Sequence, residues 1–295
     1  MKKIKVFYRP EQTVNDNDSF SPSARKPAEV LASWQAAGLP VEVCSFQPLD
    51  ASEISIAHDP DYVNGVLDLT APNGFGNVLA SVASSLPFTT GSLAAAVLHS
   101  LETGEPTASL ASGFHHAGFD HGSGFCTFNG LMVAALLARM AGAKKVGILD
   151  CDNHYGDGTI DIIEHLGLED FIQHWTFGGE TITAGESAEA WLERFPQIVI
   201  QFRGCDVLIY QAGADPHIDD PLGGVLTSEQ MRRRDQIVFE ICKLLNIPVA
   251  WNLAGGYQTP LRKVLDLHDA TMRECVSSYL TKEDNEKAQG ENYVA

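Results

Sequence analysis

The chain has 295 residues, of which 44% are hydrophobic and 20% are charged, so it can bury the core of one large α/β domain or two ordinary ones. Its 20 Lys and Arg against 38 Asp and Glu give a net charge of −18. This charge argues against nucleic acid or an anionic membrane as a partner and is compatible with a cationic substrate.

Short apolar or β-branched runs alternate with segments of helical periodicity along the chain. The runs predict strands at residues 3–8, 41–46, 107–112, 145–150, 171–176, 206–211 and 248–254. Helical periodicity is clearest at 128–143, 188–202 and 227–246, and Thr227 with Gln230 predicts a capping box. The alternation predicts a three-layer α/β fold, with a mostly parallel central sheet and helices on both faces.

No repeat or linker divides the sequence, so we expect a single domain over residues 1–281 and a polar tail at 282–295. Residues 70–92 are rich in Gly, Ser and Asn and predict a long loop. The six cysteines show no CxxC spacing, which predicts buried free thiols instead of disulfides or a structural zinc site. The sequence shows neither a signal peptide nor a run of about 18 apolar residues, so we expect a cytoplasmic protein.

The stretch "ILDCDNHYGDGT" at 148–159 ends a predicted strand in polar groups at every second position. Asp150, Asp152 and His154 therefore share one face, where two neighbouring carboxylates repel each other unless a cation compensates them. A divalent metal held by Asp152 and His154 would do so. The alternative is a strand-end turn whose polar groups cap the next helix, a role that Asp157 could also take.

Two further strand exits carry groups of the same kind. Asp215, in "YQAGADPHIDDPLGG" at 210–224, is a candidate third ligand, and two aspartates with one histidine would leave a coordination position open, as in catalytic zinc sites. Such a set of ligands could also take Fe²⁺ or Co²⁺. His115 and His116 follow the strand at 107–112 and could form a proton-transfer pair, or could simply be packed or surface residues.

The last stretch, "WNLAGGYQ" at 251–258, places Tyr257 after two glycines. The glycines allow a tight turn that would present the phenol as a hydrogen-bond donor to a developing oxyanion. Gly-Gly-Tyr is also an ordinary turn, so this stretch alone leaves both interpretations open.

Taken together and in this order, the four stretches resemble the histone deacetylase superfamily, which includes bacterial acetylpolyamine amidohydrolases. The match runs from about residue 58 to Tyr257, and the pattern of two histidines followed by GFC and Phe-Asn is met by His115, His116, 124–126 and 128–129. The resemblance implies an arginase/deacetylase-like fold and zinc-dependent hydrolysis of an N-acyl amide.

The resemblance also implies roles for individual residues. His116 would act as general base and then acid, His115 would give electrostatic support, and their carboxylate partners would be Asp157 and Asp150 respectively. Zinc would be held by the residues Asp152, His154 and Asp215, and Tyr257 would donate to the oxyanion. The substrate tunnel would be formed by the residues Gly124, Phe125, Phe177 and Leu222, and Gly256 would also contact the substrate. Each of the four tunnel residues could instead be a core residue, and for Leu222 the two interpretations are equally good.

Three departures from the family pattern bear on cofactors and substrate. The early His-Pro motif is not visible in residues 19–27, and Ile172 stands where many relatives have a serine that helps to hold a structural K⁺. Asp150, Asp152 and backbone carbonyls could still bind that cation. Residues 70–92 contain no aspartate of the kind with which protein deacetylases anchor a peptide.

The sequence therefore predicts a zinc amidohydrolase that removes an acyl group, first of all acetyl, from a small N-acylated amine such as an acetylpolyamine. Alternatives are a deacetylase of acyl-lysine in proteins or peptides, a two-manganese ureohydrolase of the related arginase fold, and a non-catalytic protein that binds acyl ligands. A homo-oligomeric contact that narrows the entrance is a further expectation that the sequence leaves open.

Overall fold

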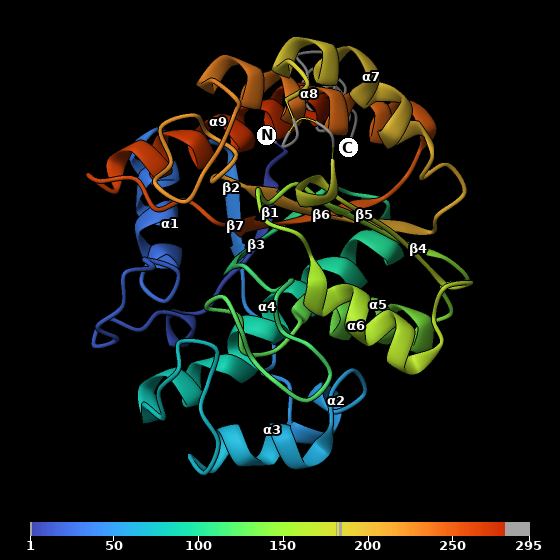
Figure 1. Cartoon of the computed structure of the whole chain (residues 1–295). Coiled ribbons are helices and arrows are strands. Elements are labelled where there is room, and N and C mark those ends of the chain that lie inside the picture. The colour runs from blue at the N-terminus through green and yellow to red at the C-terminus, as the bar shows by residue number, and fades with distance from the viewer. Residues whose placement is uncertain (1, 181, 183–184, 281–295) are drawn as a thin grey trace, which may run out of the picture.

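A sheet of seven parallel strands forms the centre of the protein (Figure 1). The computed structural model describes residues 2–180, 182 and 185–280, so the predicted tail lies outside the described residues. The strand order is β2-β1-β3-β7-β6-β4-β5. The strands are β1 Ile4–Phe7, β2 Val41–Cys44, β3 Thr107–Ser112, β4 Val146–Asp150, β5 Ile172–Thr176, β6 Val207–Gly213 and β7 Val249–Ala254, which confirms the seven predictions.

Helices cover both faces of the sheet, as predicted (Figure 1). The described helices are α1 Lys26–Ala36, α2 Ala51–Ile54, α3 Pro60–Leu67, α4 Ala80–Thr103, α5 Gly130–Met140, α6 Asp157–Leu166, α7 Ala188–Ile200, α8 Ser228–Leu245 and α9 Arg262–Tyr279, with 3-10 turns η1 Pro10–Gln12 and η2 Phe177–Gly179. The helices α1, α7, α8 and α9 lie on one side, and α4, α5 and α6 on the other. The capping box of Thr227 and Gln230 at the start of α8 is confirmed.

Each face of the sheet has its own apolar core. Alternate residues of β6 serve the two cores: Leu208 and Tyr210 pack beneath α7, α8 and α9, whereas Val207 and Ile209 pack against the α4 side. A strand buried on both faces must be apolar at successive positions, which explains the continuous apolar runs in the sequence. The six cysteines are free, with Cys44 half-buried and the other five buried, as predicted.

The predicted loop at 70–92 is wrong in its second half, because α4 begins at Ala80. Ser, Gly and Pro87 in this segment have poor intrinsic helix propensity. The helix forms nonetheless because it buries a face that includes Val82, Ala83 and Leu86. Tertiary packing has therefore overridden local propensity, and the long loop is confined to residues before 80.

The helix α4 is also the one described helix that is long and apolar enough to cross a membrane by length and composition. Its most apolar window has a mean hydropathy of 1.3, but 61% of that window is buried inside the protein. The helix packs against α5 and β3. Its apolar character is accounted for by its position in the core.

His58, just before α3, is a fully buried histidine with both ring nitrogens in use. Nδ1 donates to the carbonyl of Gly118 at 2.8 Å, and Nε2 accepts from the backbone N–H of Asn129 at 2.8 Å. Asn129 in turn donates to the carbonyl of Ala117. His58 therefore fixes the loop that follows His115 and His116, and burial lowers the pKa of its ring to about 4.

The pKa of His58 predicts how stability depends on pH. In the unfolded chain this histidine takes up a proton below about pH 6.5, whereas in the folded protein it stays neutral down to about pH 4. The free energy of unfolding should therefore fall as the pH falls through this window, by up to about 1.4 kcal/mol per pH unit for this one group. Urea unfolding between pH 7.5 and 4, with a chelator present, gives the number of protons that the protein takes up on unfolding. This number should be smaller by about one in His58→Gln than in wild type. The exposed His121→Gln is the matched control, and parallel pH profiles for wild type and His58→Gln would contradict the prediction.

Candidate active site

Four neighbouring strands in the middle of the sheet bring the predicted site together. The strands β3, β7, β6 and β4 are adjacent, and polar residues follow the carboxyl end of each, where ligands bind in open parallel sheets. A small pocket at this edge is lined by His115, His116, Asp152, His154 and Tyr257, together with Ser23, Ser112, Gly113, Gly124, Phe125, Cys126 and Gly255. Residues from four separated stretches of sequence thus share one pocket.

Asp152, His154 and Asp215 form a cluster that could hold a metal ion. Each offers one ligand atom, and these atoms all lie within 4.8 Å of one another. Nδ1 of His154 faces both carboxylates, at 3.1 Å from Oδ1 of Asp152 and 2.9 Å from Oδ2 of Asp215. It is the one such group of three or more ligating residues that the described part of the chain contains.

The environment of Asp215 favours a cation at this place. Its side chain is fully buried, with Nδ1 of His154 2.9 Å from Oδ2, and Oδ1 has no hydrogen-bond partner among the described residues. Burial, together with the charge of Asp152, raises the pKa of Asp215 to about 7. Two buried carboxylates that share one imidazole are costly unless a further positive charge compensates them, so the three side chains fit a divalent metal.

The two predicted dyad histidines lie side by side, with ring centroids 4.1 Å apart, and each has its own carboxylate. Nδ1 of His115 donates to Oδ2 of Asp150 at 2.7 Å, and Nδ1 of His116 donates to Oδ1 of Asp157 at 2.6 Å. The expected pairing of histidines and aspartates is present in this geometry. Both Nε2 atoms are thereby left to face other partners.

The surroundings separate the two histidines in their affinity for protons. Burial alone would lower the pKa of His115, but the charges of Asp150 and Asp152 outweigh it and raise this pKa to about 9. Burial and the neighbouring charge of His115 lower the pKa of His116. At neutral pH His115 is therefore the cation of the pair, and His116 is the neutral ring that can accept a proton.

Asp150 accepts hydrogen bonds that connect the strands β4, β5 and β6 with His115 of the dyad. Its Oδ1 accepts from the backbone N–H of Asp152 at 3.1 Å and from Nε2 of Gln211 at 2.8 Å. Its Oδ2 accepts from His115 and, at 3.3 Å, from the hydroxyl of Thr176. Sequence reasoning missed Gln211 and Thr176, which lie opposite Asp150 in the registers of β6 and β5.

The same register corrects the expectation about Ile172. Ile172 pairs with Val146, at the opposite end of β4 from Asp150. A hydroxyl at position 172 would therefore not face Asp150. The hydroxyl beside Asp150 belongs to Thr176. A side-chain oxygen is therefore available at this place, and a structural K⁺ stays a prediction.

The turn that carries Tyr257 is held from two sides. Gly255 has a φ of +43°, and a Cβ there would lie 2.1 Å from Oδ1 of Asp215, so only glycine fits. Nζ of the fully buried Lys26 donates to the carbonyl of Gly255, and Oδ2 of Asp220 accepts the backbone N–H of Tyr257 at 2.8 Å. Burial and the charge of Asp152 raise the pKa of Tyr257, so its hydroxyl stays protonated. Sequence reasoning missed Lys26, because it lies in residues 19–27, where the early His-Pro motif of the family is not visible.

Aromatic rings line the way to the pocket. The ring of Phe125 lies 5.9 Å from that of Tyr257, and its neighbour Gly124 is packed so closely on His116 that a Cβ would come within 2.3 Å of the imidazole. The ring of Phe20 also stacks on Tyr257, with centroids 5.7 Å apart and an interplanar angle of 11°. Phe20 is 63% exposed, and sequence reasoning missed it because nothing in its local sequence marks a contact with residue 257.

Of the other predicted tunnel residues, Phe177 lies in the core and not in the tunnel. It is fully buried and packs edge-on against Trp191, with ring centroids 5.0 Å apart, because η2 turns it into the core beneath α7. Gly256 packs against Ala214 and Val264, and Gly255 lines the pocket in its place. Leu222 is 39% exposed in the loop that Asp220 anchors, and its role stays a prediction.

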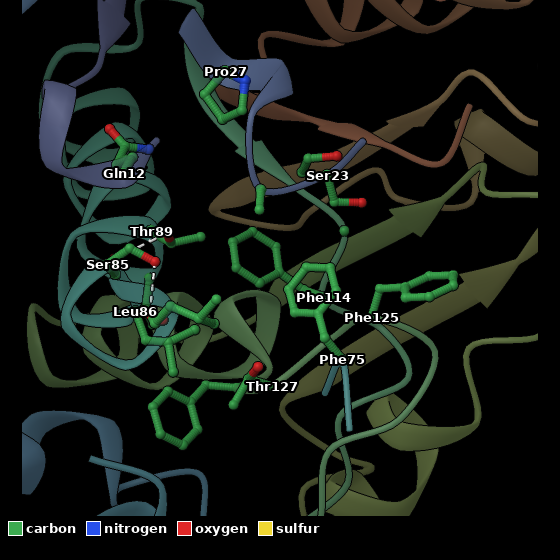
Figure 2. A pocket seen from close by; sticks show the side chains of 16 residues that line it. Gln12, Ser23, Pro27, Phe75, Ser85, Leu86, Thr89, Phe114, Phe125 and Thr127 are labelled. Carbon is green, nitrogen blue, oxygen red and sulfur yellow. Dashed lines mark hydrogen bonds between the residues drawn. The ribbon is translucent and has the colours of Figure 1, made fainter. Parts of the chain in front are cut away.

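Figure 2 shows a second cavity next to this pocket. Phe75, Phe114 and Phe125 lie on one side of it, and Ser85, Leu86 and Thr89 of α4 lie on the other. The two spaces share the lining residues Ser23, Ser112, Gly113 and Phe125. The candidate site therefore adjoins an internal space that is lined by aromatic rings and hydroxyl groups.

Comparison with known proteins agrees with this geometry. The model of the histone deacetylase domain matches residues 22–169. Histone deacetylase 15 of Arabidopsis thaliana is 29% identical over 270 residues, which are 77% of this chain and 48% of the relative. The chain thus spans about half the length of that protein.

Two solved structures share the fold. The HD domain of HDA15 superposes with a TM-score of 0.77 at 21% sequence identity, covering 95% of this chain and 90% of that chain. An acetylpolyamine aminohydrolase from Burkholderia pseudomallei superposes with a TM-score of 0.70 at 17% identity, covering 94% and 99%. The fold is therefore shared over nearly the whole chain.

The buried carboxylate of Asp215, which lies next to the carboxylate of Asp152, predicts opposite effects of one substitution. Asp215→Asn keeps the shape and removes the charge, so the metal-free variant should be more stable than metal-free wild type by about 1–3 kcal/mol. Added Zn²⁺ should raise the melting temperature of wild type and leave that of the variant unchanged. Urea unfolding with a chelator and thermal unfolding with Zn²⁺ measure the two effects. A less stable metal-free variant, or an equal gain with Zn²⁺, would contradict the prediction.

Proposed function

Because this chain belongs to the histone deacetylase family, whose members act on acylated amines and hydrolyse amide bonds, we propose that it is a zinc-dependent amidohydrolase that removes an acyl group from a small N-acylated amine. The observation that carries the proposal is a single pocket lined by Asp152 and His154, two members of the cluster with Asp215, together with a neutral histidine and a protonated tyrosine. We also propose that residues 1–281 act as one catalytic domain, since both helical layers pack on one sheet.

The residues Asp152, His154 and Asp215 would hold the metal. Two carboxylates and one imidazole are ligands of catalytic zinc sites and leave room for water and substrate, and Fe²⁺ or Co²⁺ would also fit them. When bound, the cation would polarise the acyl carbonyl and lower the pKa of a water molecule. The ring of His154 is oriented toward both carboxylates, so the ligand set is assembled before any ion arrives.

His116 would move the proton. Its lowered pKa keeps the ring neutral at physiological pH, and Asp157 holds Nδ1 so that Nε2 can accept a proton from the attacking water. The protonated ring would then donate that proton to the departing amine. The charged His115, fixed by Asp150, would stabilise negative charge that develops nearby and would disfavour a lasting second charge on His116.

Tyr257 would donate a hydrogen bond to the oxyanion of the tetrahedral intermediate. Its raised pKa ensures that the hydroxyl carries a proton to donate. The turn around Gly255 is fixed by Lys26 and Asp220, so the phenol is held in place before substrate binds. Donors that are preorganised in this way are among the largest contributors to catalysis of acyl transfer.

A small amine is the substrate class that we favour. The net charge of −18 would attract a polycation such as an acetylpolyamine, and residues 70–92 offer no aspartate to anchor a peptide backbone. Phe20, Phe125 and Tyr257 would flank the slender methylene chain next to the acyl group. Acyl-lysine in proteins is the second candidate, because the similarity to histone deacetylase 15 extends over most of this chain.

The decisive experiment is turnover of a panel of acyl amines by the metal-loaded protein. We expect hydrolysis of acetylpolyamines, loss of activity with a chelator and its return with Zn²⁺. His116→Ala should abolish turnover, and Tyr257→Phe should lower kcat about 100- to 1000-fold, since it removes one oxyanion donor.

Circular dichroism and zinc content should be unchanged in both variants. Preference for acetyl-lysine peptides would favour the second candidate. Binding of acylated amines without turnover at saturating metal would reject the enzyme, and two metal ions per chain would favour a ureohydrolase.

Phe20→Ala tests the proposed entrance. Loss of the stacked ring should lower kcat/KM by about 2- to 12-fold for substrates with a methylene chain, mainly through KM. Leu244→Ala, which truncates an apolar residue on α8 that is 77% exposed, is the control and should have no effect. Equal kinetics for Phe20→Ala and wild type would contradict a role for Phe20 in binding.

A further inference from the structure

Arg234, on α8, is a buried cation that lies directly behind the metal-ligand cluster. Its side chain is 1% exposed. Nη1 donates to two backbone carbonyls at once, that of Gly213 at 2.9 Å and that of Cys151 at 3.3 Å. A single guanidinium nitrogen thus bridges the ends of two neighbouring strands, β6 and β4.

Both bridged carbonyls belong to the segments that carry metal ligands. Cys151 immediately precedes Asp152, and Gly213 stands two residues before Asp215. The strand pairing of β4 with β6 ends at Asp150 and Gln211, followed by a backbone hydrogen bond of 3.0 Å from Cys151 to Gln211. Beyond that point the two segments lead to the ligands, and Nη1 of Arg234 donates a hydrogen bond to each of them.

The approach of the two backbones at this point is unusually close. A Cβ on Gly213 would lie 2.6 Å from Cα of Asp152 and 2.6 Å from the carbonyl oxygen of Cys151. A glycine is therefore required at 213 for the strands to meet. A small change in their separation would move both ligand carboxylates.

Arg234 is itself held rigidly. Nε donates to Oδ1 of Asp235 at 2.8 Å, and Asp235 also accepts hydrogen bonds from the hydroxyls of Tyr210 on β6 and Thr271 on α9. Burying an ion pair is weak evidence for a role in stability, because apolar residues of the same volume often stabilise a protein as well. The geometry of this network points to a different role.

We propose that Arg234 is a positioning residue that sets the distance between Asp152 and Asp215 by clamping the carbonyls of Cys151 and Gly213. The inference rests on the proposed metal site. In this role Arg234 on α8 keeps the ligands in place in the absence of the ion, so that metal binding does not have to order them. Residues that orient metal ligands from behind typically change metal affinity about 10- to 100-fold when they are replaced.

Arg234→Lys tests the clamp. Lysine keeps the positive charge but lacks the planar fork that reaches both carbonyls and Asp235 together. We expect Zn²⁺ to bind about 10- to 100-fold more weakly, as measured by competition with a chromophoric chelator. The visible absorption of the Co²⁺-loaded variant should also change, since that spectrum reports the geometry of the ligands.

Arg262→Lys is the matched control. Arg262 also bridges two helices through its guanidinium, with bonds of 2.8 Å to the Ser33 hydroxyl and 2.6 Å to Asp269, but it contacts none of the metal-ligand segments. Its substitution should lower the melting temperature and leave the Zn²⁺ affinity and the Co²⁺ spectrum unchanged. A general loss of stability is thereby separated from a loss of ligand geometry.

The outcomes separate the two proposals. A wild-type protein that binds no divalent metal would reject the proposed function. A wild type that binds Zn²⁺, with equal affinity in Arg234→Lys, would overturn the clamp alone. If Arg234→Lys does not fold, Tyr210→Phe is the second variant, because it removes one of the hydrogen bonds that hold Asp235. Tyr210→Phe should weaken Zn²⁺ binding measurably. Unchanged Zn²⁺ affinity in that variant would also overturn the clamp.

Discussion

The charge of the buried carboxylates is the constraint on which the site depends. Asp150, Asp152 and Asp215 lie at the ends of two adjacent strands with almost no access to water. Each is compensated to a different extent: Asp150 accepts four hydrogen bonds, Asp152 lies next to His115 and His154, and Asp215 faces His154 alone of these histidines while its Oδ1 has no described partner. This gradient from full to partial compensation distinguishes a structural carboxylate from one that is available to a cation.

Much of the fold and site followed from the sequence because both depend on local patterns. Continuous apolar strands separated by helices define a parallel sheet, and in such a sheet the carboxyl ends of all strands lie at one edge. Once His115, Asp152, Asp215 and Tyr257 were each assigned to a strand end, their meeting required only that their strands be neighbours. The strand order β3-β7-β6-β4 supplies that condition.

The residues that sequence reasoning missed act over long distances along the chain. Lys26 reaches Gly255, Phe20 stacks on Tyr257, and Arg234 clamps Cys151, and no local pattern marks these partners. Ile172 was considered in place of Thr176 because motif spacing does not reveal strand register. Phe177 was assigned to the tunnel although η2 turns its ring inward, and the start of α4 looked like a loop because burial, not propensity, makes it helical.

The strand order has a consequence for how the protein is made. The strands β2, β1 and β3 form one side of the sheet and β4 and β5 the other, and the two strands that lie between them, β6 and β7, are the last to be synthesised. Until residues 207–254 have left the ribosome, the apolar helix α4 lacks its contact with β7, and exposed apolar surface of this kind makes incompletely folded chains prone to aggregation. Insertion of these two strands joins the halves, so Asp215 and Tyr257 reach the residues that follow β3 and β4 only when the centre of the sheet is filled.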